Sequence, residues 1–113
     1  MQREQRLRRS RDFGAVQRRG RAYSAGPLVL RTLPNERPVS RAGFVVSKRV
    51  GTAVIRNRVK RRLRAAVDSI GARPGYDLVV IARPEASQHD YRSLRQALAG
   101  LMRRAGIATG PVQ

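Results

Sequence analysis

The spacing of apolar residues near the start of the chain predicts a short helix. Phe13 and Val16 lie three residues apart, which places their side chains on one face of a helix over residues 10–19. Ser10 is expected to be the N-cap, and Gly20 is expected to end the helix. One apolar face of this segment should therefore pack against the rest of the fold.

Two extended segments follow. The first covers residues 22–33, with a break at Gly26-Pro27, and the second covers residues 41–50. A loop with two prolines, residues 34–38, separates them. Strands are expected in both segments, and the two segments are candidates to pair with each other as a hairpin.

Residues 50–67 predict an amphipathic helix that ends near Gly71, with Asn57 at or near its N-cap. Its apolar face consists of Val59, Leu63, Ala66, Val67 and Ile70. Its opposite arc carries Arg58, Arg61 and Arg62, and this arc is flanked by Lys60 and Arg64. The apolar face should pack on a sheet, which leaves the basic arc facing outward.

The last part of the chain predicts one more strand and one more helix. Residues 76–83 form an apolar run between proline and glycine positions, typical of a buried central strand. Residues 90–107 repeat apolar side chains at helical spacing. The order helix, strands, helix, strand, helix indicates one α/β sandwich domain over residues 1–113, whose ends near 1–8 and 108–113 are expected to be flexible. A strand–helix–strand crossover is normally right-handed.

The charge of the chain adds a partner to this picture. Among 113 residues, 25 are basic and 7 acidic, which gives a formal net charge of +18. Self-repulsion of this size favours a polyanionic partner, with nucleic acid as the first candidate and an anionic membrane surface as the second. All basic residues except Lys48 and Lys60 are arginines; arginine suits phosphates, although a GC-rich genome would also favour it.

The positive charge is densest in one stretch. Between Lys48 and Arg64 there are eight basic residues and no acidic one. Arginines at the start of a helix are unfavourable next to the positive end of the helix dipole. A solvated helix face would more naturally carry acids there, so a phosphate backbone or a folded RNA fits this stretch better.

The residues that usually perform catalysis are not grouped in the sequence. The seven acidic residues, which are Glu4, Asp12, Glu36, Asp68, Asp77, Glu85 and Asp90, form no pair at helix or strand spacing of the kind that holds metal ions in nucleases. His89 is the one histidine, there is no cysteine, and there is no phosphate-binding or dinucleotide fingerprint. The sequence therefore indicates no catalytic residue and no metal site in the protein itself.

One stretch resembles a known family. Residues 44–61 read FVVSKRVGTAVIRNRVKR, and they resemble the signature of the bacterial ribonuclease P protein subunit, with Arg56-Asn57-Arg58 at its centre. The similarity extends to residues 7–13 and 76–87, and so over nearly the whole chain. It implies an α+β fold like a ribosomal-protein domain, with three helices and a mixed sheet of about four strands in the order αβββαβα. It also implies a left-handed strand–helix–strand crossover, against the usual rule.

The resemblance implies a function as well. In this family the RNA subunit is the catalyst and holds the Mg²⁺ ions, and the protein is an accessory subunit of the endonuclease. The protein binds the catalytic RNA and the 5′ leader of precursor tRNA, which is removed to give the mature tRNA 5′ end. The resemblance thus predicts a cytoplasmic ribonucleoprotein that needs no membrane and no protein partner, and a protein that binds no cofactor itself.

The family motif assigns two groups of site residues by position. The residues expected to contact the catalytic RNA are Lys48, Arg49, Arg56, Asn57, Arg58, Lys60, Arg61 and Arg62. The residues expected to line the leader cleft are Arg9, Phe13, Gln17 and Arg31. Gln17 and Arg31 stand where the family often has aromatics, so arginine contacts are expected to replace some base stacking. Core packing is an equal alternative role for Phe13.

Three other classes remain as rivals. A small ribosomal protein would share the charge and the fold but would not require the Arg-Asn-Arg block. A DNA-binding module would be expected to show a helix-turn-helix pattern, and a stand-alone nuclease would need clustered carboxylates.

Overall fold

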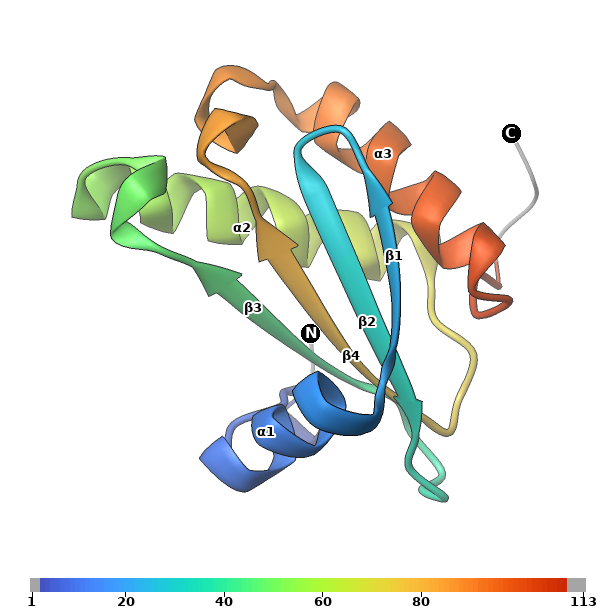
Figure 1. The fold of residues 1–113 in the computed structure, drawn as a ribbon. Coiled ribbons are helices and arrows are strands. Elements are labelled where there is room, and N and C mark those ends of the chain that lie inside the picture. Colours follow the sequence, from blue (N-terminus) through green and yellow to red (C-terminus); the bar gives the residue numbers. More distant parts are fainter. Residues whose placement is uncertain (1–2, 110–113) are drawn as a thin grey trace.

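Four strands form a mixed sheet in the order β1-β2-β4-β3 (Figure 1). They are β1 (Arg21–Ala25), β2 (Leu28–Pro34), β3 (Arg41–Val46) and β4 (Tyr76–Ala82). β1 and β2 form an antiparallel hairpin, β4 lies antiparallel to β2, and β3 lies parallel to β4. The computed structural model describes residues 3–109.

The predicted hairpin between residues 22–33 and 41–50 is wrong. β4 lies between β2 and β3, so these two segments do not pair. The physical reason is the composition of β4, in which Leu78, Val79 and Val80 are all fully buried. A strand that is apolar on both faces is most stable in the centre of a sheet, where both of its edges are paired.

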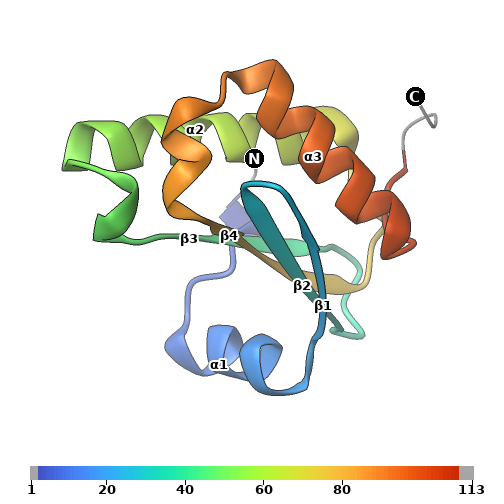
Figure 2. The same ribbon diagram turned by 45° about the horizontal axis from the view of Figure 1, so that its top comes forward.

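Residues 3–109 contain three α-helices, which cover both faces of the sheet. They are α1 (Ser10–Arg19), α2 (Ala53–Ile70) and α3 (Tyr91–Arg104). A short 3₁₀ turn, η1 (Arg3–Gln5), precedes α1, and two others, η2 (Lys48–Val50) and η3 (Pro84–Gln88), lead from β3 into α2 and from β4 into α3. Figure 2 shows α2 and α3 on one face of the sheet and α1 on the other. The prediction of an α+β fold with three helices and a four-stranded mixed sheet is confirmed.

The crossover from β3 through α2 to β4 is left-handed. β3 and β4 are parallel neighbours. In Figure 1 both strands run toward the upper left, and α2 lies behind the sheet. When the strands are turned to point upward, β4 lies to the right of β3. A connection that passes behind the sheet and moves to the right in this way is left-handed. This agrees with the crossover that the family resemblance implied, and it departs from the usual right-handed rule.

The main core lies between the sheet and the layer formed by α2 and α3. The apolar face predicted for α2 is buried as expected: Val59, Leu63, Ala66, Val67 and Ile70. A second, smaller core lies on the opposite face of the sheet, where Leu7, Val16 and Val79 are buried together. The sheet is thus packed on both faces, but the α1 side carries much less apolar cover.

Two predicted helix caps differ from the structure. Ser10 is already the first residue of α1, and Arg9 occupies the N-cap position without a side-chain cap. In α2 the N-cap is Thr52, whose hydroxyl accepts from the backbone N–H of Ile55 at 3.4 Å. Asn57 therefore lies in the second turn, because a threonine after a glycine gives an earlier capping position. Gly71 ends α2 as predicted, with a positive φ of 81°.

The described parts of both ends contact the body of the fold. Arg6 forms a bridge with Ala42 of the edge strand β3, and the N–H of Leu7 donates to the Ala42 carbonyl at 2.9 Å. Near the other end, Thr109 donates its N–H to the Gly71 carbonyl at 3.0 Å. The remainder of the segments expected to be flexible, residues 1–2 and 110–113, lies outside the described residues.

Candidate nucleic-acid interface

The sheet face that carries α1 is built from cross-strand rows of side chains. The strand register places Leu33, Asp77 and Arg41 in one row; Ala22, Arg31, Val79 and Gly43 in the next; and Ser24, Val29, Ile81 and Val45 in a third. Residues of one row share a face because side chains alternate along each strand. These rows define where a ligand on this face would meet the sheet.

The helix α1 covers the first two rows. The ring of Phe13 lies directly over Gly43, where a Cβ atom would come within 2.3 Å of the ring carbon Cζ. Val16 is fully buried against Val79 in the small core. Asp12 lies 3.4 Å from the guanidinium of Arg41. The glycine in β3 thus allows the aromatic ring of α1 to approach the sheet backbone.

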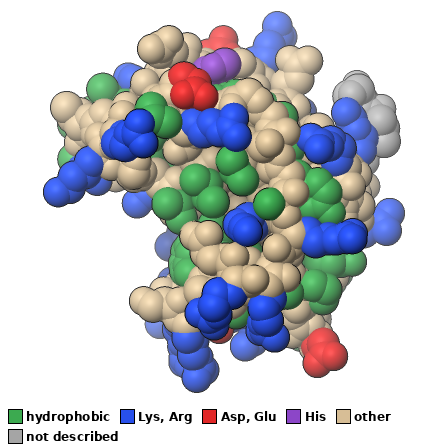
Figure 3. Space-filling model, viewed as in Figure 1, with side chains coloured by type: hydrophobic (Ala, Val, Ile, Leu, Met, Phe, Trp, Pro, Cys, Tyr) green, Lys and Arg blue, Asp and Glu red, His purple; other side chains and the backbone are tan. Residues whose placement is uncertain are grey.

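The third row is left partly open. Val29, Val45 and Ile81 are only half-buried, although all three are large and apolar. Figure 3 shows hydrophobic side chains on this face, with a hollow between α1 and the end that carries η2, and Lys and Arg side chains on either side. We call the half-buried row of Val29, Val45 and Ile81, together with the hollow on this face, the sheet cleft. Its apolar floor and basic margins suit bases and phosphates of a single strand.

The four residues predicted for the leader cleft lie on or near this face. Phe13 and Arg31 are half-buried, and Arg9 and Gln17 are exposed. Arg31 shares its row with Val79, next to the cleft floor. Its Nε atom is buried and makes no hydrogen bond within the described residues. The contact of these four residues with a leader stays a prediction.

The basic residues of α2 divide into an outer and an inner group. Asn57, Arg58 and Arg61 are exposed, whereas Arg56, Lys60 and Arg64 are half-buried at intervals of one turn. The guanidinium of Arg64 lies over the ring of Phe44 of β3, with its carbon 5.6 Å from the ring centre. A cation over an aromatic face is held by the ring's electrostatic field, so Arg64 is oriented along the β3 edge.

Two members of the inner group, Lys60 and Arg64, lie at the edge of β3, where the α2 side of the molecule borders the side that carries the sheet cleft. A hollow of about 270 Å³ is lined there by Arg6, Leu7, Arg8, Phe13, Ala42, Gly43, Phe44, Lys60 and Arg64. Lys60, predicted to contact the catalytic RNA, and Phe13, predicted to contact the leader, therefore line one hollow. The two predicted sites are thus adjacent parts of one basic surface that passes around the β3 edge.

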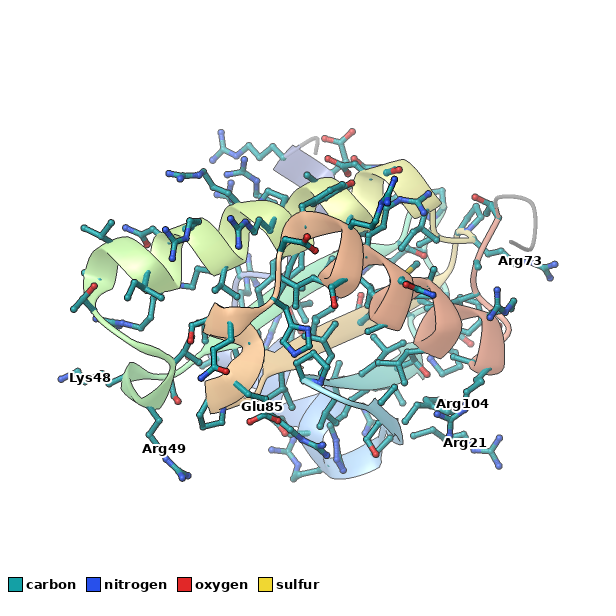
Figure 4. All side chains as sticks on the ribbon, turned by 90° about the horizontal axis from the view of Figure 1, so that it is seen from above. Arg21, Lys48, Arg49, Arg73, Glu85 and Arg104 are labelled. Atoms are coloured by element: carbon teal, nitrogen blue, oxygen red, sulfur yellow. The ribbon has the colours of Figure 1, made fainter. Side chains whose placement is uncertain are left out.

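Three further predicted residues have distinct positions. Lys48 and Arg49 lie on η2 at one end of the molecule and point outward, opposite the end that carries Arg21, Arg73 and Arg104 (Figure 4). Arg62, by contrast, donates from Nη1 to the backbone carbonyl of His89 at 2.9 Å. The structure therefore gives Arg62 a role in joining α2 to the segment before α3.

A buried ionic network anchors this interface, and sequence reasoning missed it. The guanidinium of Arg41 donates to both carboxylate oxygens of Asp77, at 2.8 and 2.6 Å, and Asn35 donates to Asp77 at 2.8 Å. The hydrogen bond and charge of Asp77 raise the pKa of Arg41 above its usual value, against the effect of burial. A lone acid at the start of an apolar strand was the available signal, because a buried carboxylate needs a partner.

The close packing of Phe13 on Gly43 was also missed. A glycine inside a strand is a known signal for the close approach of another group. The partner was not predictable from the sequence, because Phe13 and Gly43 are far apart along the chain.

Within the described residues no group of three or more His, Asp or Glu side chains is placed to hold a metal ion. His89 is hydrogen-bonded through Nδ1 to the hydroxyl of Ser93 at 2.8 Å. No helix in the described part of the chain is long and apolar enough to cross a membrane.

The fold and this surface define a small basic α+β protein that binds nucleic acid. The family model "Ribonuclease P" matches residues 1–106. The ribonuclease P protein component of Roseiflexus castenholzii is 43% identical over 115 residues, which cover 99% of this chain and 94% of that protein. That of Clostridium botulinum is 42% identical over 108 residues, covering 92% and 96%. The chain belongs to the ribonuclease P protein family.

Solved structures agree with this assignment. The RNase P protein of Staphylococcus aureus superposes with a TM-score of 0.85 at 27% identity, covering 93% of this chain and 98% of that one. The RNase P protein of Thermotoga maritima gives 0.78 at 32% identity, covering 88% and 96%. Family membership implies an RNA partner and a role in tRNA processing, and it sets aside the ribosomal, DNA-binding and stand-alone nuclease readings.

Proposed function

We propose that this protein binds the catalytic RNA of ribonuclease P through α2 and η2, and holds the 5′ leader of precursor tRNA in the sheet cleft. In this proposal the RNA subunit performs the cleavage and holds the Mg²⁺ ions, and the protein contributes binding and charge neutralisation. The reaction would take place in the cytoplasm and would require no membrane and no other protein.

The observation that carries the proposal is the continuity of the two surfaces. The exposed Asn57, Arg58 and Arg61 face away from the body, while Lys60 and Phe13 line the same hollow at the β3 edge. An RNA bound on α2 and a single strand in the sheet cleft would therefore lie next to each other. The apolar floor favours bases over duplex, because only unpaired bases can stack or pack there.

The proposed role of the protein in the reaction is electrostatic. Phosphates that meet arginines release their counterions, so each ion contact makes binding more sensitive to salt. A cationic protein at the junction of the two RNAs reduces their mutual repulsion, which otherwise needs additional Mg²⁺. We therefore expect the protein to lower the Mg²⁺ concentration at which the RNA cleaves.

The proposal is tested by reconstitution. The protein is mixed with the ribozyme RNA and a leader-bearing precursor tRNA at low Mg²⁺, and the cleavage rate is measured with and without protein. Stimulation is expected, and it should be greater for a substrate with a leader of several nucleotides than for one with a single-nucleotide leader. No stimulation at any protein concentration would refute the proposal.

A further inference from the structure

The helix α1 has one directional link to the sheet. Its apolar contacts, Phe13 on Gly43 and Val16 on Val79, are not directional, because the hydrophobic effect depends mainly on buried area. Its one side-chain hydrogen bond within the described residues joins Asp12 to Nη1 of Arg41 at 3.4 Å. Asp12 directly precedes Phe13, so this link acts next to the aromatic ring.

The sheet side of this link is rigid. Arg41 and Asp77 are register partners in β3 and β4, and their side chains are only 13% and 8% exposed. Two N–H donors of one guanidinium bind both oxygens of Asp77, a geometry that fixes the plane of the arginine fork. Asn35 holds the same carboxylate from the loop after β2. The remaining Nη1 of Arg41 is therefore held in one direction, toward α1.

We propose that the chain Asp12–Arg41–Asp77 is a positioning device that fixes the register of α1 on the sheet and thereby sets the shape of the sheet cleft. Asp12 and Arg41 are positioning residues in this view, because they act through Phe13 and the cleft and touch no RNA. The inference rests on the proposed function, in which the cleft holds the precursor leader. Without the link, α1 stays tied to the sheet by its apolar contacts and by the chain on either side of it, at Leu7 and at Arg21, but loses the side-chain contact that orients it between them.

The test uses Asp12→Asn, which keeps the size of the side chain and removes its charge, so that Arg41 faces only a weaker, neutral acceptor. Arg41 keeps both hydrogen bonds to Asp77, so this change leaves no buried charge unpaired, and the variant should fold. Asp90→Asn is the matched control. It makes the same change of charge at the start of α3, and asparagine keeps the capping role of Asp90, whose carboxylate accepts from the Ser93 N–H at 2.8 Å.

Three quantities are measured for each holoenzyme: affinity for a leader-bearing precursor, affinity for the same tRNA without leader, and affinity of the protein for the catalytic RNA. Asp12→Asn should reduce the affinity gained from the leader about threefold to tenfold, a loss of the size expected for one ordinary hydrogen bond, since the pair is long at 3.4 Å. Affinity for the catalytic RNA should stay within about twofold. Both variants gain positive charge, so a purely electrostatic role predicts tighter RNA binding for both, the opposite direction.

Hydrogen exchange of the free protein provides a second readout. Asp12→Asn should speed amide exchange in α1 and leave α2 and α3 unchanged, while Asp90→Asn should leave α1 unchanged. Arg41→Lys should reproduce the effect of Asp12→Asn on α1, and the double variant should be less than additive, because both changes weaken the same link.

Unchanged α1 exchange in Asp12→Asn would overturn the positioning role, and so would faster α1 exchange with undiminished leader discrimination. If the unmodified holoenzyme itself shows no leader discrimination, the proposed function of the cleft fails, and α1 exchange alone then decides whether the link fixes the helix. The two failures are therefore distinguishable.

Discussion

At the scale of single residues, the most informative contact is that of Phe13 with Gly43. The phenyl ring occupies the space that any larger residue at position 43 would need. Phe13 is only half-buried, so the same ring packs on the sheet and borders the hollow at the β3 edge. The two roles considered for Phe13, core packing and contact with RNA, are compatible with this one position.

Gly43→Ala should therefore destabilise the protein, because its Cβ would lie 2.3 Å from the Phe13 ring and would displace it. A loss of about 1–3 kcal/mol in the free energy of unfolding is expected for such overpacking. Gly100→Ala is the control: it lies inside α3, and its Cβ would meet nothing closer than 3.9 Å. That change should stabilise the protein by about 0.5–1 kcal/mol. Urea denaturation of both variants checks the opposite signs, and equal effects would contradict the packing.

Neighbouring arginines of α2 should also behave differently. Arg61 is exposed, so Arg61→Ala should leave the free energy of unfolding nearly unchanged. It should reduce the slope of log affinity for RNA against log salt concentration by about one, the value for one lost phosphate contact. Arg62→Ala removes the bond to the His89 carbonyl and should cost about 1.5–3 kcal/mol of stability. Chemical denaturation and salt titration of RNA binding together separate the two roles. A stability loss as large for Arg61→Ala would be inconsistent with this division.

At the scale of elements, α2 serves two opposed requirements. Its first turn contains no acidic residue, although an acid there would favour the helix dipole. The only charged residue of that turn is the half-buried Arg56, and the exposed Arg58 and Arg61 follow in the next turns, while the inner face of the helix packs on the sheet. The free helix is thus less stable than one with an acidic residue in its first turn, and an RNA bound at its start would offset this cost.

Thr52→Asp tests this balance, because Thr52 is the N-cap of α2. An aspartate cap should raise the free energy of unfolding by about 0.3–1 kcal/mol through the dipole. It should also weaken binding to the catalytic RNA, since a negative charge would face phosphates. Thr52→Asn keeps the cap without the charge and is the control. Equal RNA affinity for the Asp and Asn variants would show that the start of α2 lies away from RNA.

At the scale of the whole molecule, the net charge of +18 acts on stability as well as on binding. The chain has 25 basic residues and only 7 acidic ones, and two of the seven, Asp12 and Asp77, pair with the same arginine, Arg41, so acidic neighbours are too few to compensate most of the basic side chains. Repulsion among them disfavours the compact state in the absence of a polyanion. Salt or RNA should therefore stabilise the fold.

The melting temperature should rise when NaCl increases from about 0.01 to 0.1 M, because the screening length falls from about 30 to 10 Å over this range. Thermal unfolding at several salt concentrations measures this rise. A variant with Arg58→Gln and Arg61→Gln should show a smaller rise. A melting temperature that is independent of salt, or that falls, would argue against charge repulsion in the free protein.

The sequence by itself determined the elements and the chemistry of the surface. The helical spacing of Val59, Leu63 and Val67 predicted the buried face of α2, and the apolar run of β4 predicted a central strand. These features are local, because periodicity along the chain reports which side of an element is buried. The family resemblance also depended on a contiguous stretch, residues 44–61.

Only the tertiary structure decided how distant residues meet. The insertion of β4 between β2 and β3, the Phe13–Gly43 contact and the chain from Asp12 to Asp77 all join segments far apart in the sequence. Non-local pairing depends on which faces fit together in the folded chain, and no local pattern records it. For the same reason, the junction of the two predicted RNA sites at the β3 edge became visible only in the structure.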